Sequence, residues 1–182
     1  MAGLMGSNSL ADLAAALYKP PLRKVFVSYH HGGDQAYFET FVKTFSDTYD
    51  VFSDKSLERA YDSDDDDYVR FQIRQNDITG SSCTIVLCGA RTHARKYVDW
   101  EVKATLDKSH GLIGVWLPTL ALAPNGGTVK PARLQDNIDS GYAKWVRWGG
   151  LPVDGWRATI ESAVAAPARL IVNNRSMRQR NG

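Results

Sequence analysis

Short, predominantly apolar segments that alternate with amphipathic segments constrain this fold more than any other feature of the sequence. They are rich in β-branched and aromatic residues, which is typical of buried strands. These segments are KVFVSY at 24–29, DVFS at 50–53, CTIVLC at 83–88 and LIGVWL at 112–117. Strands that are apolar on both faces need helices over both faces. The sequence therefore predicts an α/β fold with a doubly wound, flavodoxin-like parallel sheet.

Helical periodicity fills most of the intervals between these strands. One segment repeats apolar side chains at i, i+3, i+4 and i+7, namely Phe38, Phe41, Val42 and Phe45. Further helices are predicted near 68–76, over 94–106 and over 153–165. The stretch 118–150 contains several prolines and glycines, so we expect it to be irregular.

The chain divides into a single α/β domain with an extension at each end. Residues 1–22 form a predicted helical extension with an apolar face that consists of Leu10, Leu13, Ala14 and Leu17. This helix either packs on the main domain or docks a partner. The main domain spans 23–166, and the basic tail 167–182 has no apolar face in its last eight residues, so we expect the tail to be disordered.

Composition excludes several classes of partner. The net charge is only +2, which provides no global field for nucleic acid or for a membrane surface. No apolar run approaches the roughly 20 residues that a membrane span needs. Cys83 and Cys88 lie five residues apart on one predicted strand, so they face opposite sides and cannot pair. We therefore expect two buried thiols and a cytoplasmic protein that binds neither nucleic acid nor membrane.

Three motifs are candidates for a metal or phosphate site. The acidic run YDSDDDD at 61–67 lacks the glycine and final glutamate of a calcium loop, so we interpret it as a solvated loop. His30 and His31 have no second ligand cluster, and no metal site is predicted. Gly32 and Gly33 permit close approach to a phosphate, but a plain strand-to-helix turn explains them equally well.

Other functions of flavodoxin-like folds find no support in the motifs. The first and third strands end in VSYHH and VLCGA, which lack the carboxylates of a phosphoacceptor receiver domain. A nucleophilic serine elbow, G-x-S-x-G, does not occur. The aromatic segment 142–156 either stacks bases or covers one edge of the core, and we favour the core.

Glu101 is the remaining candidate. It follows Tyr97 by four residues on the predicted helix 94–106, so the two side chains share a face. If Val98 and Val102 pack on the sheet, Glu101 lies at the flank of the packed face. That position is close to the carboxyl ends of the strands, where ligands of such folds bind. Glu101 is therefore either surface charge or the chemical centre of the protein.

Three segments resemble TIR-like domains. They are RKVFVSYHH, VFSDKS and the long stretch SSCTIVLCGARTHARKYVDWEVKATLDKSHGLIGVWL. The most specific part is a strand that ends V-L-x-G, followed by T-x-x-R-x-(aromatic)-V-x-x-E. The likeness covers about residues 23–165 and is greatest to the bacterial TIR-like family that includes the Thoeris anti-phage sensor. TIR domains have a flavodoxin-like fold, in agreement with the strand and helix pattern.

The resemblance implies an activity and a set of site residues. Enzymatic members cleave NAD+ at the nicotinamide–ribose bond with one glutamate in a W-x-x-x-E pattern. That glutamate corresponds to Glu101, and Tyr97 stands where the family has tryptophan. The likeness also implies a substrate-binding set at the first two strand ends: Ser28, Tyr29, His30, Phe52 and Asp54. NAD+ is then the substrate, and no cofactor or metal is expected.

One carboxylate is chemically sufficient for this reaction. The pyridinium leaves as neutral nicotinamide, so no general acid is required, in contrast to a typical glycosidase. A carboxylate beneath the ribose stabilises the developing oxocarbenium ion. Water then gives ADP-ribose, whereas an internal nucleophile gives an isomer of cyclic ADP-ribose, which activates a downstream effector in Thoeris-type members. The resemblance further implies head-to-tail self-association and a phage-derived trigger. The alternative is a non-enzymatic TIR module that acts only as an interaction scaffold.

Overall fold

The computed structural model describes residues 22–52, 78–120, 122–123 and 126–182. Five parallel strands form one sheet in the order β2-β1-β3-β4-β5. The strands are β1 (Arg23–Ser28), β2 (Tyr49–Phe52), β3 (Cys83–Cys88), β4 (Gly111–Trp116) and β5 (Lys144–Arg147). This order is that of a flavodoxin-like sheet. The predicted fold class is therefore confirmed.

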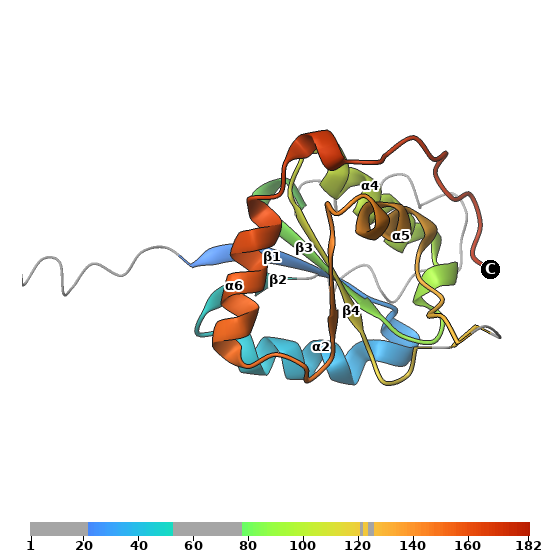
Figure 1. The fold of residues 1–182 in the computed structure, drawn as a ribbon. Helices are drawn as coiled ribbons and strands as arrows, with labels where there is room; N and C mark the ends of the chain where they lie inside the picture. The colour runs from blue at the N-terminus through green and yellow to red at the C-terminus, as the bar shows by residue number, and fades with distance from the viewer. Residues whose placement is uncertain (1–21, 53–77, 121, 124–125) are drawn as a thin grey trace, which may run out of the picture.

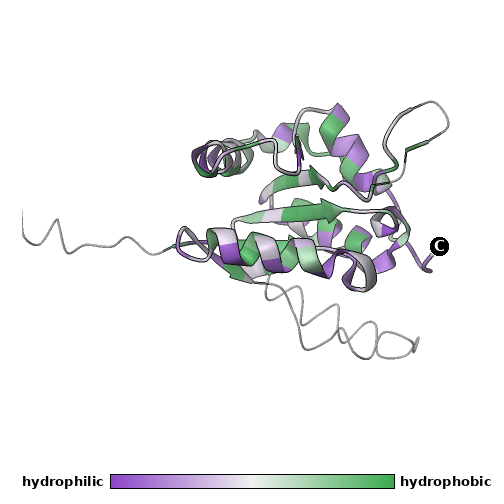
Figure 2. Ribbon diagram, turned by 90° about the horizontal axis from the view of Figure 1, so that it is seen from below, coloured by the Kyte–Doolittle hydropathy of each residue, from purple (hydrophilic) through white to green (hydrophobic). Residues whose placement is uncertain are grey.

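Helices cover both faces of the sheet. On one face lie α2 (His31–Phe45) and α6 (Val153–Val164), and on the other lie α4 (Lys96–Asp107) and α5 (Ala132–Asp139) (Figure 1). Two short 3₁₀ helices, η2 (Thr92–Ala94) and η3 (Ala168–Leu170), precede α4 and follow α6. Figure 2 shows hydrophobic strands between helices whose outer sides are largely hydrophilic. The two-layer burial explains why the strand sequences are almost continuously apolar.

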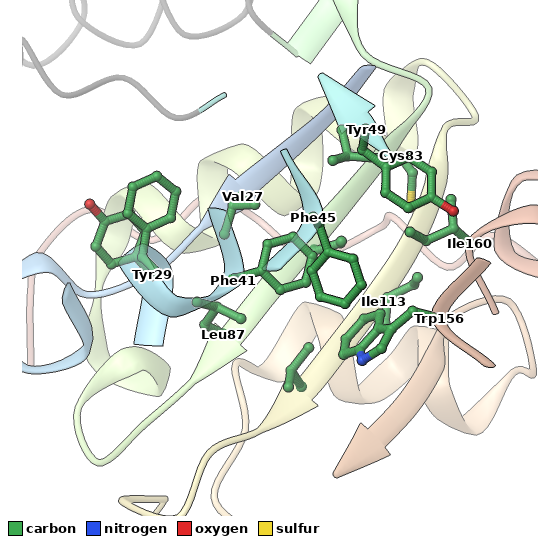
Figure 3. Close-up of a cluster of buried hydrophobic side chains, with 14 of the residues drawn as sticks. Val27, Tyr29, Phe41, Phe45, Tyr49, Cys83, Leu87, Ile113, Trp156 and Ile160 are labelled. Atoms are coloured by element: carbon green, nitrogen blue, oxygen red, sulfur yellow. The ribbon is translucent and has the colours of Figure 1, made fainter. Parts of the chain in front are cut away.

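The core beneath α2 and α6 is aromatic. Trp156 of α6 packs edge-on against Phe41 and Phe45 of α2, with ring centroids 5.4 and 5.7 Å apart (Figure 3). Each such side chain contributes about 1.5–3 kcal/mol when it is withdrawn from water. This cluster fixes α2 on the sheet, and with it the strand-to-helix turn after β1.

The core beneath α4 is aliphatic. Val98, Val102 and Leu106 of α4 are buried against β3, as their helical spacing predicts. Cys83 belongs to the cluster under α2, whereas Cys88 belongs to the cluster under α4. The two thiols therefore face opposite sides of the sheet, as predicted, and both are free.

The prediction of an irregular stretch over 118–150 was wrong, because this stretch contains α5 and β5. The buried face of α5 includes Arg133 and Asn137 beside Leu134, so its apolar pattern is interrupted by polar residues. The strand β5 is a four-residue edge strand that is only partly buried. Neither element has the apolar periodicity on which a sequence prediction depends.

The C-terminal tail does not match the predicted disorder, because polar contacts hold it against α4 and α5. The guanidinium of Arg133 is fully buried and donates to Asp99 Oδ1 at 2.9 Å and to Asn173 Oδ1 at 2.7 Å. It also donates to the carbonyl oxygens of Arg175 and Ser176 at 3.0 and 3.2 Å. Hydrogen bonds of this kind leave no hydrophobic pattern in the sequence.

Three predicted segments fall outside the described residues: the helix within 1–22, the acidic loop 61–67 and the helix near 68–76. None of the helices that the structure describes combines the length and the apolar character needed to cross a bilayer.

Candidate functional site

The site is built where one side of α4, which packs over β3 and β4, reaches β1. Side chains along β1 alternate between the two faces of the sheet, so Val25 and Val27 enter the core under α2. Phe26 points the other way and packs with Ala104 of α4. Ser28 follows Phe26 by two residues and therefore faces α4 as well.

Two contacts set the register between strand and helix. Phe26 packs with Ala104, and His30 Nδ1 lies 3.2 Å from the hydroxyl oxygen of Tyr97. Ser28 lies between Phe26 and His30 along the strand, and Glu101 lies between Ala104 and Tyr97 along the helix. Ser28 and Glu101 therefore occupy opposing positions, close to the carboxyl edge of the sheet where ligands of such folds bind.

Both opposing side chains are buried. Glu101 is 3% exposed, which excludes the interpretation as ordinary surface charge, because glutamate is almost never fully buried without a specific reason. Ser28 is 1% exposed, and its hydroxyl has no hydrogen-bond partner among the residues that the structure describes. A buried polar atom without a partner costs about 1–3 kcal/mol, so this hydroxyl is suited to meet a ligand.

His30 is held in its neutral form. Burial lowers the pKa of this imidazole from 6.5 to about 4, and the positive charges of Arg95 and Arg91, with His31, add to the effect. A neutral imidazole has one donor and one acceptor nitrogen, so His30 Nδ1 can pair with the Tyr97 hydroxyl in either direction. The His30–Tyr97 contact therefore joins the end of β1 to the first turn of α4 without a net charge.

Tyr29 is not part of this group. Its ring stacks on Phe38 of α2, with centroids 4.6 Å apart, and its hydroxyl donates to Gln35 Oε1 at 2.7 Å. Figure 3 shows Tyr29 among the side chains that face α2, on the opposite side of the sheet from α4. The prediction that Ser28, Tyr29 and His30 line one pocket conflicts with strand alternation, which turns neighbouring side chains to opposite faces.

The second strand end is described only in part. Phe52 is the last residue of β2, and its backbone pairs in register with Phe26 of the neighbouring strand. The carboxyl end of β2 thus lies at the same edge of the sheet as Ser28. Asp54 lies outside the described residues, so its predicted role stays a prediction.

Asp34 is a buried carboxylate that the sequence analysis did not select. It is 2% exposed in the first turn of α2 and accepts hydrogen bonds from Thr92 Oγ1 at 3.1 Å and Thr119 Oγ1 at 3.4 Å. Burial raises the pKa of Asp34, and the two hydroxyls oppose this rise. The contacts fasten α2 to the loops after β3 and β4. An acidic residue in a first helical turn is common, so the sequence carried no signal of burial.

Gly89, the first residue after β3, must be glycine because the buried Asp34 carboxylate lies directly against its backbone. A Cβ atom built on Gly89 would lie 2.0 Å from Asp34 Oδ1. Gly89 therefore allows the Asp34 carboxylate to approach the backbone at the end of β3. This close approach brings the start of α2 to the loop that leads into α4.

In the described part of the chain, no three histidine, cysteine, aspartate or glutamate side chains gather as metal ligands would. The group at the edge of the sheet instead offers one buried carboxylate, one unpartnered hydroxyl and a neutral imidazole–phenol pair. Such a set suits the binding of a hydroxylated ring and the stabilisation of positive charge beside it.

A flavodoxin-like sheet with this strand order and with Glu101 buried at its carboxyl edge fits the TIR-like class of domains. The model of the family described as Thoeris protein ThsB, TIR-like domain, matches residues 26–121, which is more than half of the chain. The chain therefore belongs to this family. The matched segment contains Ser28, His30, Tyr97 and Glu101. Among curated proteins, no match to the chain was found.

Proposed function

We propose that this chain is an NAD+-cleaving enzyme of bacterial anti-phage defence, which breaks the nicotinamide–ribose bond and makes an isomer of cyclic ADP-ribose. The observation that carries the proposal is the burial of the Glu101 carboxylate, at the glutamate of the family pattern, in a member of the ThsB TIR-like family. The buried Ser28 hydroxyl, which has no hydrogen-bond partner among the described residues, supports it. The product would act as a diffusible signal on a downstream effector, and a phage-derived component would trigger its synthesis.

The proposed reaction needs no acid. The bond between ribose C1′ and the pyridinium nitrogen breaks heterolytically, and its electron pair stays on that nitrogen, which leaves as neutral nicotinamide. Positive charge develops on the ribose, where the Glu101 carboxylate would stabilise it electrostatically. A water molecule that attacks C1′ and loses a proton gives ADP-ribose. When a hydroxyl or a ring nitrogen of the same molecule attacks C1′ and loses its proton instead, the product is an isomer of cyclic ADP-ribose.

The neighbouring groups have compatible roles. The Ser28 hydroxyl would exchange hydrogen bonds with a ribose hydroxyl, which would satisfy its own unmet bonding capacity. The ring of Tyr97 would flank the nicotinamide in the place where the family pattern has tryptophan. Because His30 is neutral, it adds no positive charge beside the cation that forms on the ribose.

The first prediction concerns Glu101→Gln in the full chain. This change keeps the size of the side chain but removes its charge, so we expect NAD+ cleavage to fall by about 10²-fold or more. The measurement is release of nicotinamide from NAD+, with the products separated by chromatography. Glu39→Gln is the matched control, because Glu39 is an exposed glutamate of α2 that bonds only to Gln35 in the described structure.

The two variants separate the outcomes. Wild-type turnover in Glu39→Gln with loss in Glu101→Gln supports the catalytic role, provided that both unfold at the wild-type temperature. Near-wild-type turnover in Glu101→Gln would refute it. If the wild type releases no nicotinamide at any protein concentration, with or without phage lysate, the non-enzymatic interaction module becomes the better explanation.

A further inference from the structure

Two arginines beside the proposed site have no charged partner among the residues that the structure describes. Arg91 and Arg95 lie in the connection between β3 and α4, and neither forms an ion pair in the described part of the chain. The Nε atom of Arg95 is buried and has no hydrogen-bond acceptor among the described residues. A buried guanidinium N–H without an acceptor destabilises the fold, and a bound anion would remove that cost by accepting the hydrogen bond.

Three other arginines of the protein have their positive charge compensated by a carboxylate. Arg23 pairs with Glu161, the buried Arg133 pairs with Asp99, and Arg175 pairs with Asp136. The protein thus supplies carboxylates to arginines elsewhere on its surface and in its interior. The absence of such a carboxylate at Arg95 leaves net positive charge next to His30, whose protonation both Arg95 and Arg91 oppose.

The backbone around Arg95 adds to this charge. Arg95 is the N-cap residue of the 12-residue helix α4, and the positive end of the helix dipole favours an anion there. Tyr97 follows two residues later and contacts His30. Ser28, whose buried hydroxyl is also unpartnered, precedes His30 by two residues on the same face of β1. The positive charge therefore lies beside the group that opposes Glu101.

We propose that Arg95, assisted by Arg91, forms an anion subsite that holds the pyrophosphate of the dinucleotide while its nicotinamide ribose lies between Ser28 and Glu101. This assignment rests on the proposed function, because it assumes the same substrate. Arg95 is the arginine of the T-x-x-R-x-(aromatic)-V-x-x-E pattern, and the assignment gives it a binding role that the pattern does not state. Guanidinium groups suit the geometry of phosphate oxygens.

The first test measures binding without turnover. Glu101→Gln protein is titrated with inorganic pyrophosphate and with ADP-ribose by calorimetry, and Arg95→Gln is then added to that background. Loss of one charge-assisted contact should weaken both affinities by about 10-fold or more. Arg169→Gln is the matched control, because Arg169 is an exposed arginine in η3 that forms no ion pair in the described part of the chain. Arg95→Lys keeps the charge and should restore part of the affinity.

The second test distinguishes a role of Arg95 in binding the phosphates from a role in the cleavage reaction. In the otherwise wild-type chain, Arg95→Gln should raise KM for NAD+ with a smaller change in kcat, and should leave cleavage of nicotinamide riboside unchanged, because that substrate has no phosphate. If the wild type cleaves neither substrate, the proposed function fails, and the calorimetry still decides the subsite.

The outcomes that overturn the subsite are specific. Absence of measurable binding of either probe to Glu101→Gln, or equal affinity in Arg95→Gln and Arg169→Gln, contradicts it. If Arg95→Gln does not fold, Arg91→Gln takes its place, because Arg91 is exposed and its replacement disturbs no packing. We then expect a weaker loss of affinity in the same direction.

Discussion

At the scale of single residues, His30 has the chemistry that depends most on its surroundings. Its pKa of about 4 results first from burial and then from Arg95, Arg91 and His31. In the unfolded chain the same imidazole has its usual pKa of 6.5. Because the folded pKa is the lower one, protonation favours the unfolded state. Stability from this residue is present above pH 6.5 and is lost as the pH falls through about 4.

The second prediction therefore concerns His30→Gln and the dependence of stability on pH. The free energy of unfolding of the wild type should decrease more steeply between pH 6.5 and 4 than that of the variant, because the variant has no titrating group at position 30. Urea unfolding at pH 7.0 and pH 4.5 measures the difference between the two proteins at each pH. That difference should shift in favour of the variant at pH 4.5. A difference that is the same at both pH values would contradict the assigned pKa.

Asp34 illustrates a buried charge with a structural task. Its carboxylate joins the start of α2 to Thr92 and Thr119, and Gly89 leaves the space for it. Burial raises the pKa of Asp34 because it destabilises the charged form of the carboxyl group. The hydrogen bonds from the Thr92 and Thr119 hydroxyls offset part of this destabilisation. These contacts hold together the loops that surround the proposed site.

At the scale of elements, α4 is held at its N-terminus by the end of the chain. The backbone N–H of Lys96 donates to Asn181 Oδ1 at 3.0 Å, and the N–H of Gly182 donates to the carbonyl oxygen of Ala94 at 2.9 Å. The indole N–H of Trp100 donates to the carbonyl oxygen of Arg178 at 2.8 Å. Arg95, the N-cap residue, supplies no side-chain cap of its own. Asn181 therefore caps the helix that carries Tyr97 and Glu101.

The third prediction compares Asn181→Ala with Asn181→Asp. Loss of a capping acceptor costs about 0.5–1 kcal/mol at an exposed position, so Asn181→Ala should speed hydrogen exchange in the first turn of α4. Asn181→Asp keeps an acceptor and adds a negative charge that the helix dipole favours, so it should exchange like the wild type. Emission from Trp100 provides a second readout. Equal protection in all three proteins would mean that the tail contributes nothing to α4.

At the scale of the whole molecule, we predict that the active form is an assembly. TIR-like enzymes commonly complete their site by head-to-tail association, and contacts of that type extend into filaments when the rotation does not close. Specific NAD+ cleavage should then rise faster than linearly with protein concentration, or appear only with a phage-derived trigger. A concentration series with parallel light scattering tests this. Constant specific activity from a species that remains monomeric would exclude it.

Much of the architecture could be predicted from local patterns. The four apolar strands, the helices over 31–45, 96–107 and 153–164, and the opposite facing of Cys83 and Cys88 follow from periodicities of two and 3.6 residues. Glu101 could be selected because it shares a helical face with Tyr97 near the strand ends. These inferences succeed because burial of apolar side chains is the largest favourable term in folding and leaves a regular trace in the sequence.

The tertiary structure alone decided the features that depend on polar contacts between distant segments. It placed Tyr29 on the face opposite Ser28 and His30, buried Asp34 above Gly89, and brought the tail to α4 through Arg133 and Asn181. Among the described residues, it also left the buried Nε atom of Arg95 without a hydrogen-bond acceptor. A hydrogen bond or ion pair needs only two groups that meet in space, and their separation along the chain follows no period. The sequence by itself thus determined the layers of this protein, whereas only the folded chain decided which polar groups meet at their edge.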